Sequence, residues 1–314
     1  MSLLEHESWS PSLYFLLLLR LQIYYMKTTF SRTVQGCMGW GSWGHDLSAS
    51  EMTQRINFCV EQGITTFDHA DIYGDYSTEE TYGKALSQAG INRETIQLIS
   101  KCGIQYVGKA RDNAIKHYQY DAEYIIWSAE RSIKLLQAEY LDLFLLHRPS
   151  PLLQPEEVVK AIETLLDTGK IRAFGVSNFT PSQTRLLSKY VPVSVNQIEF
   201  SLTHFQPMLQ GDLDMMISKD ITPMAWSPLG SVFKEDSEQT KRIHTVLENL
   251  TKKYSATKDQ LLLGWILKHP AMIHPVIGTS TESRIAQAVA AEHIALEETD
   301  WFALWVASQG HKVP

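Results

Sequence analysis

The sequence has few cysteines and no cluster of basic residues. Its three cysteines, Cys37, Cys59 and Cys102, are an odd number, show neither CxxC nor CxxH spacing and lie in apolar segments. They indicate neither a disulfide framework nor a zinc site, which is typical of a reducing compartment, so we expect a cytoplasmic protein. The net charge is −7 and the 28 Lys and Arg residues are scattered, so nucleic acid is not an expected partner.

The sequence also lacks an apolar run long enough to span a bilayer. Residues 13–19 are apolar, but the run stops at Arg20 and follows two glutamates, where a signal peptide carries positive charge. We therefore expect no membrane partner, a membrane-surface helix being the less favoured alternative. Met26 begins a segment that resembles a second start. Residues 1–25 are thus expected to be an N-terminal extension, helical, disordered or due to an upstream start codon, and residues 26–314 to form one domain.

Eight short apolar runs, rich in β-branched and aromatic residues, alternate with amphipathic segments of helical period. No internal repeat and no linker rich in Pro and Gly divides them. Eight strand-like runs with a helix between most neighbours are typical of the α/β class and of a closed (β/α)8 TIM barrel, for which 314 residues suffice. The runs cover residues 35–41, 64–70, 95–103, 141–147, 171–178, 194–200, 221–229 and 275–280.

Several helices have recognisable start and stop signals. Ser48 and Glu51 form a capping box ahead of a periodic segment, and Gly63 ends that segment before the second run. Further helices are expected over residues 122–139, 163–170 and 299–309, the last of them after the eighth strand.

Polar residues with complementary chemistry follow three consecutive runs, at the strand ends where barrel enzymes carry their reacting groups. The second run ends at Asp68 and leads to Tyr73, the third ends near Lys101, and the fourth ends at His147. Taken singly, each residue is more often a cap, a solvated charge or rim packing. Their order on neighbouring strands favours one shared site.

The four side chains have the chemistry of a proton donor. A free tyrosine has a pKa near 10, so a catalytic tyrosine needs a neighbouring cation, which Lys101 supplies. Asp68 would keep that buried ammonium charged, and His147 would donate a hydrogen bond to a substrate carbonyl. The group suits the protonation of an alkoxide by Tyr73 while a hydride arrives from elsewhere.

Two other sites are less favoured. Residues 39–44 match GxGxxG letter for letter, but no helix begins at the third glycine and no acidic residue ends a second strand at the required distance, which disfavours a Rossmann site. A metal site is disfavoured because the sequence has no HxH pair and Lys101 would repel a cation, so no metal is expected. The candidate ligands for that site are Asp68, His69, Asp71 and His147.

Several stretches together resemble the aldo-keto reductase family: GITTFDHADIYG, the Ser100-Lys101 strand end, LDLFLLH and GKIRAFGVSNF. The resemblance covers about Phe30 to the C-terminus. Within the family the chain is most like the bacterial YdhF-type oxidoreductases, with which it shares DHADIYG, SKCGI, HRP, GVSNFTP and MAWS. The resemblance implies NADPH-dependent reduction of a small aldehyde or ketone, with Tyr73 as the proton donor. It also implies a catalytic tetrad, Asp68, Tyr73, Lys101 and His147.

The same resemblance implies where the cofactor binds. Ser177, Asn178 and Gln197 match residues that bind the nicotinamide carboxamide, and Trp226 matches the ring that stacks on the nicotinamide. Arg284 can clamp a 2′-phosphate, so NADPH is favoured over NADH, although the family's neighbouring lysine is absent and Gln287-Ala288 stands in place of its Glu-Asn pair. The remaining expected cofactor positions are Gly41, Ser42, Trp43, Ser227, Leu229, Ser231, Gly278, Thr279 and Gln287.

Two functions remain open at this point. The complete set of four side chains favours a reductase, and the alternative is a nucleotide-sensing barrel subunit with little turnover, like the potassium-channel β-subunits. Residues 106–120, 204–211 and 230–238 are expected to set specificity. No feature of the sequence specifies the physiological substrate or an oligomeric state. An aromatic-walled pocket is expected from Trp40, Trp43, Tyr106 and Phe205.

Overall fold

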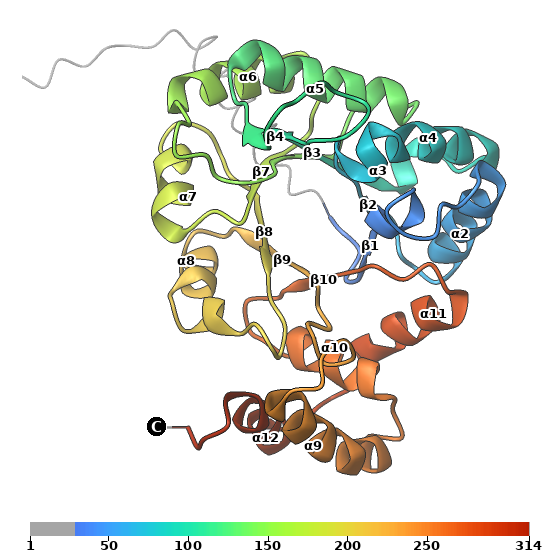
Figure 1. Cartoon of the computed structure of the whole chain (residues 1–314), viewed down its shortest axis with the longest axis vertical. Helices are drawn as coiled ribbons and strands as arrows, with labels where there is room; N and C mark the ends of the chain where they lie inside the picture. Colours follow the sequence, from blue (N-terminus) through green and yellow to red (C-terminus); the bar gives the residue numbers. More distant parts are fainter. Residues whose placement is uncertain (1–28, 314) are drawn as a thin grey trace, which may run out of the picture.

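Eight parallel strands close into a barrel in the computed structural model, which describes residues 29–313 (Figure 1). Each predicted run overlaps one of these strands, so the predicted (β/α)8 barrel is confirmed. The predicted extension, residues 1–25, lies outside the described residues. In their order around the barrel the strands are β1 (Val34–Gly36), β10 (His274–Ile277), β9 (Thr222–Trp226), β8 (Val195–Glu199), β7 (Phe174–Ser177), β6 (Leu143–Leu146), β3 (Gln97–Cys102) and β2 (Thr66–Asp68).

The strands are buried on both faces, which explains why they read as continuous apolar runs. In β6, Leu143 and Leu145 belong to a cluster inside the barrel, whereas Phe144 and Leu146 belong to the larger core between the barrel and its helices. This alternation is the period of two that an extended strand imposes.

Helices surround the barrel (Figure 1). The capping box at Ser48 and Glu51 is confirmed, since each residue's side chain accepts the other's backbone N–H. The helices are α2 (Ala49–Glu61), α3 (Tyr73–Tyr76), α4 (Thr78–Ala89), α5 (Ala122–Leu135), α6 (Pro155–Asp167), α7 (Pro181–Ser188), α8 (Asp212–Ser218), α9 (Glu238–Tyr254), α10 (Lys258–Leu267), α11 (Glu282–Ala290) and α12 (Glu298–Gln309).

Some boundaries differ from the predictions. The first run was expected to be strand through residue 41, but β1 ends at Gly36 and a 3-10 turn, Met38–Trp40, follows. The helix expected over residues 122–139 ends at Leu135, because Gln137 has a left-handed backbone. The helix expected over residues 163–170 is only the end of α6, which begins eight residues earlier at Pro155.

A small hairpin lies over the end of β3 where the sequence indicated only a variable loop. Its strands, β4 (Ile104–Gln105) and β5 (His117–Tyr118), pair in antiparallel fashion. Gly103 allows the turn into β4, because its φ is +111° and a Cβ there would lie 2.1 Å from the Tyr120 ring. No helix among residues 29–313 is both long and apolar enough to cross a membrane.

Candidate active site

The polar residues of the site continue the inner face of the barrel. Ile99, Leu145, Val195 and Met224 belong to the cluster inside the barrel. Because side chains alternate along a strand, the residue two positions after each of them has the same orientation, at the carboxyl end of the barrel. These residues are Lys101, His147, Gln197 and Trp226.

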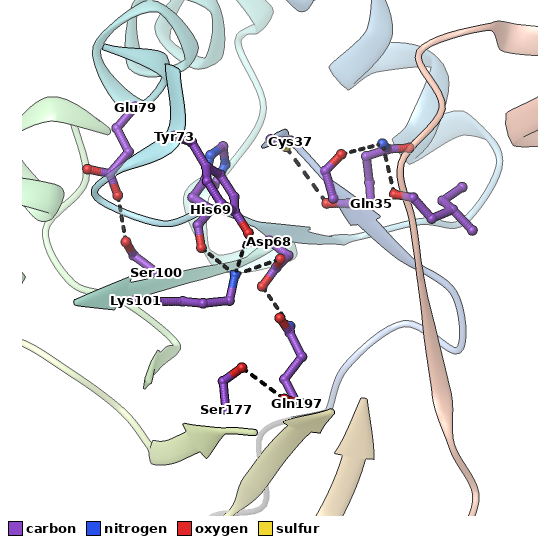
Figure 2. Close-up of polar contacts among 12 residues, drawn as sticks. Gln35, Cys37, Asp68, His69, Tyr73, Glu79, Ser100, Lys101, Ser177 and Gln197 are labelled. Atoms are coloured by element: carbon purple, nitrogen blue, oxygen red, sulfur yellow. Dashed lines mark hydrogen bonds and ion pairs between the residues drawn. The ribbon is translucent and has the colours of Figure 1, made fainter. Parts of the chain in front are cut away.

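Lys101 is the centre of the site (Figure 2). Its Nζ lies 2.7 Å from Asp68 Oδ2 and 2.7 Å from the backbone oxygen of His69, and it donates to the Tyr73 hydroxyl at 3.2 Å. The side chain is fully buried. Burial alone would lower the pKa of Lys101, but Asp68 and Tyr73 outweigh it and the pKa is raised, so the amine is charged at neutral pH.

Gln197 connects Asp68, the partner of Lys101, to the opposite side of the barrel. Its amide donates to Asp68 Oδ1 at 2.9 Å, and its backbone oxygen accepts from the Ser177 hydroxyl at 2.8 Å (Figure 2). Asn178 donates to that hydroxyl at 2.8 Å and accepts from Trp226 Nε1 at 2.9 Å. The three residues expected to bind the carboxamide thus form one hydrogen-bonded network with Asp68, Lys101 and Tyr73, and within the described part of the chain His147 is not part of it.

The pKa of Tyr73 differs from the expectation. Lys101 lowers it, as expected, but burial raises it by more, and the net pKa lies above the ordinary value of a tyrosine. The phenol is therefore protonated at neutral pH, the form that a proton donor requires. The ammonium reduces the unfavourable effect of burial on a tyrosinate without reversing it.

His147 faces the same tyrosine. The two rings meet edge to face, with their centroids 6.1 Å apart. Burial lowers the pKa of His147 well below its usual range, and the charges of Lys101 and Arg148 lower it further. The ring is consequently neutral and has one N–H to donate. Its Nδ1 has no hydrogen-bond partner among the described residues.

The residues of the disfavoured metal site do not gather around one point. His69 packs edge to face against Tyr82 in the core, at 4.1 Å between ring centroids, and Asp71 accepts from Tyr124 and Ser128 on α5 at 3.2 Å each. Among residues 29–313, no group of three or more His, Cys, Asp or Glu side chains is arranged to hold a metal ion.

Asp71 makes the stability of the fold depend on pH. Burial, with the nearby Glu79 carboxylate as a smaller cause, raises the pKa of Asp71 to about 7. The folded chain then holds this proton more tightly than the unfolded chain, so the contribution of Asp71 to stability decreases as the pH rises from about 4 to about 7. Relative to the wild type, Asp71→Asn should gain stability over that range, with a slope of up to about 1.4 kcal/mol per pH unit.

Urea unfolding of both proteins across this pH range measures the difference. The amide keeps an acceptor oxygen for Tyr124 and Ser128, so the loss of the titration dominates. Parallel stability profiles for the two proteins would show that Asp71 does not titrate in this window.

The remaining expected cofactor positions lie at the same end of the barrel. Gly41, Ser42 and Trp43 follow the 3-10 turn after β1. The positions Ser227, Leu229 and Ser231 follow β9, Gly278 and Thr279 follow β10, and Arg284 and Gln287 lie on α11. Leu229 packs against the core, and Gln35 donates to the Thr279 backbone oxygen at 3.0 Å.

Of the four residues expected to line an aromatic pocket, two lie near Tyr73 and two lie in the core. Trp43 is partly exposed, with its ring centroid 5.0 Å from that of Tyr106 and 6.4 Å from that of Tyr73. Trp40 and Phe205 are buried in the core instead, Trp40 against Tyr82. They were misplaced because an aromatic residue at a strand end serves packing as readily as a pocket.

Sequence reasoning also missed Glu79, a buried carboxylate behind the site, and the two serine hydroxyls that donate to it. Glu79, on α4, accepts from the Ser100 hydroxyl at 2.5 Å (Figure 2). It also accepts from the Ser132 hydroxyl at 3.0 Å. Glu79 does not follow a strand, so it is not selected by the rule that reacting groups lie at the carboxyl ends of barrel strands. Glu79 lies six residues after Tyr73 in the sequence, and this proximity is the signal available to find it.

The barrel and its rim of Asp, Lys, Tyr and His side chains define an oxidoreductase of one family. The sequence profile described as "Aldo/keto reductase family" matches residues 34–305, and the chain belongs to that family. It is 40% identical over 291 residues to "Uncharacterized oxidoreductase YcsN" of Bacillus subtilis (strain 168) and 39% identical over 291 residues to "Oxidoreductase YdhF" of Escherichia coli (strain K12). Each alignment covers 91% of this chain and 96% of the relative.

A further relative is "6-dehydroglucose reductase" of Agrobacterium fabrum (strain C58), 37% identical over 292 residues, which are 91% of this chain and 97% of the relative. Among solved structures, the thermostable aldo-keto reductase Tm1743 in complex with the inhibitor epalrestat has a TM-score of 0.78 at 25% identity, covering 90% of this chain and 97% of that one. An aldo/keto reductase from Klebsiella pneumoniae in complex with NADP and acetate has a TM-score of 0.72 at 23% identity, covering 91% and 93%.

Proposed function

We propose that this chain reduces a small aldehyde or ketone to an alcohol, with NADPH as the hydride donor and Tyr73 as the proton donor. The observation that carries the proposal is the fully buried Lys101 ammonium, held by Asp68 and within 3.2 Å of the Tyr73 hydroxyl. A buried cation is unfavourable unless it is paired, and here it is aimed at a phenol.

The chain's own groups then divide the work. The neutral His147 donates its N–H to the substrate carbonyl oxygen and orients it. Tyr73 transfers its proton to that oxygen as negative charge develops there, and Lys101 stabilises the tyrosinate that results. Asp68 and Gln197 hold the ammonium in place. When bound, NADPH supplies the hydride from its nicotinamide C4 to the carbonyl carbon.

The residues at the ends of the seventh and eighth barrel strands, β9 and β10, fit a dinucleotide phosphate. Barrel enzymes frequently bind phosphate at this position. A Cβ at Gly278 would meet nothing within 4 Å, so the backbone there borders open space. Arg284 is exposed and its guanidinium has no ion pair among the described residues. It would bind a 2′-phosphate, with Ser227, Ser231 and Thr279 supplying hydroxyls and Ser177, Asn178 and Trp226 holding the nicotinamide.

Two relatives support the choice of cofactor and substrate. The Klebsiella protein binds NADP, which supports NADPH here. The Agrobacterium protein is named for the reduction of a carbonyl on a sugar, which supports a small polar carbonyl compound as one substrate class. Aromatic aldehydes are a second class, because the Trp43 ring contacts both Tyr73 and Tyr106.

The test is the oxidation of NADPH, and of NADH in parallel, with a panel of sugar-derived, aliphatic and aromatic carbonyl compounds. We expect oxidation that requires the carbonyl compound, with NADPH preferred by about tenfold or more because Arg284 gains a charged contact. Tight binding of NADPH without turnover on any member of the panel would instead support the nucleotide-sensing alternative.

A further inference from the structure

The chain reverses its backbone handedness directly after Tyr73. Gly74, Asp75 and Tyr76 have φ values of +59°, +55° and +68°. Glycine adopts this region freely and aspartate tolerates it, but a bulky aromatic residue rarely does. Such a turn persists only where its surroundings hold it in place, and strained turns of this kind gather at functional sites.

The Asp75 carboxylate holds the turn against the loop between β4 and β5, residues 106–116. Its Oδ2 accepts the backbone N–H groups of Lys109 at 2.7 Å and Ala110 at 3.2 Å. Gly108 lies flat against the same carboxylate, since a Cβ there would be 2.1 Å from Asp75 Oδ1. Only a glycine leaves room for this approach.

Tyr76 makes a second attachment to the same loop. Its hydroxyl donates to the Ile104 backbone oxygen at 3.2 Å and accepts the Tyr106 N–H at 3.0 Å. The Arg111 guanidinium lies 3.9 Å from the centre of the Tyr76 ring and donates to the Tyr124 hydroxyl at 3.0 Å. Two consecutive left-handed residues thus hold residues 104–111, which include the first half of the loop.

The anchored loop carries part of the substrate wall. Tyr106 contacts the Trp43 ring, which in turn contacts the ring of Tyr73. The Lys101 to Tyr73 contact joins β3 to the first residue of α3 and includes no residue of the loop, so a shift of the loop moves the wall without removing that contact.

We propose that Asp75 is a positioning residue that sets substrate specificity, by fixing residues 106–116 on the turn after Tyr73 and so placing Tyr106 at the substrate mouth. The inference rests on the proposed reductase function. The substrate class that depends on Asp75 is a carbonyl compound long enough to reach Tyr106, such as an aromatic aldehyde with two rings. A small aliphatic aldehyde that reaches only Tyr73 and His147 does not depend on it.

Substitutions at the two sides of the contact test the proposal. Asp75→Gly keeps the left-handed backbone and removes the acceptor, whereas Asp75→Asn keeps an acceptor oxygen and tolerates the same backbone. We expect Asp75→Gly to raise the KM for the two-ring aldehyde about tenfold, because the variant loses charge-assisted hydrogen bonds to the loop. The kcat and the KM for propanal should stay within about twofold of the wild-type values. Asp75→Asn should restore most of the affinity.

Gly108→Ala provides the complementary change. Its methyl group would collide with the Asp75 carboxylate, so the variant should raise the same KM. In an Asp75→Gly background it should add little, because the colliding group is gone. Asp46→Gly is the matched control, since Asp46 has a left-handed backbone (φ +48°) and an exposed side chain without a contact among the described residues.

Hydrogen exchange tests, without a substrate, whether Asp75 holds the loop. The Lys109 and Ala110 amides should exchange faster in Asp75→Gly than in the wild type or Asp46→Gly. Unchanged exchange of these two amides in Asp75→Gly would show that Asp75 does not hold the loop. Faster exchange with equal changes in KM for both aldehydes would overturn the role in specificity. If the wild type reduced no carbonyl compound, the proposed function would fail, and exchange would still decide whether Asp75 holds the loop.

Discussion

Replacement of Tyr73 by phenylalanine is expected to lower kcat for carbonyl reduction by about 10²- to 10⁴-fold, the usual contribution of a general acid. The change removes one hydroxyl and retains a ring that is almost fully buried. Lys101 loses one acceptor but keeps Asp68 and the His69 backbone oxygen, each at 2.7 Å, so the ammonium remains paired. The effect should therefore fall on the proton transfer and not on the fold.

Initial rates of NADPH oxidation measure the loss of kcat. An unfolding curve and a binding titration for NADPH show whether the variant keeps its stability and its affinity for the cofactor. Tyr82→Phe is a matched control. Tyr82 is fully buried beside β2, and its hydroxyl has no hydrogen-bond partner among the described residues, so its removal should leave kcat within about twofold. A folded Tyr73→Phe protein that keeps the wild-type rate would show that the proton comes from another group.

Removal of the Asp68 carboxylate is expected to destabilise the fold by about 3–5 kcal/mol, because Asp68→Ala leaves the Lys101 ammonium buried and unpaired. The Gln197 amide loses its acceptor as well. The double variant with Lys101→Met should be more stable than Asp68→Ala alone, since it removes the uncompensated charge along with its partner. Urea unfolding of Asp68→Ala, Lys101→Met, the double variant and the wild type measures the coupling between the two residues.

An exposed pair serves as the comparison. Glu80 and Lys84 form an i,i+4 ion pair at 2.7 Å with both side chains more than half exposed, so Glu80→Ala should change stability by no more than about 0.5 kcal/mol. If Asp68→Ala were as mild as Glu80→Ala, the ammonium would not depend on Asp68, and the explanation for a charged lysine inside the barrel would be wrong.

The sequence was sufficient to predict the barrel because its strands are buried on both faces and their helices have clear caps. Leu143 to Leu146 reads as a strand whichever neighbour it pairs with, and Ser48 and Glu51 satisfy each other locally. The four side chains of the candidate site were selected by the same logic, since each lies at or shortly after the carboxyl end of a strand.

Other features depend on contacts that no local pattern encodes. Gln197 bonds to Asp68 across 129 residues of sequence, a link that exists only once the barrel has closed. The direction in which the Tyr73 pKa shifts depends on whether the effect of burial or that of the Lys101 charge is stronger. Predicting it requires knowing how deeply the phenol is buried in the fold. Trp40 reads as a mouth residue until the position of Tyr82 shows that it lies in the core.

The backbone of Asp75 and Tyr76 lies beyond prediction for a related reason. Only Gly74 in that turn suggests a left-handed conformation, and local preference argues against it for Tyr76. Contacts from Lys109, Ala110 and Arg111, more than thirty residues away, overcome that preference.

The transfer of deuterium from NADPH that carries deuterium at both hydrogen positions of nicotinamide C4 tests the central claim most directly. The wild-type protein, supplied with the labelled cofactor and a reactive aldehyde, should yield an alcohol with deuterium on the former carbonyl carbon, and Tyr73→Phe should form that product at least about a hundredfold more slowly. An unlabelled alcohol, no alcohol, or equal rates from the two proteins would contradict the account.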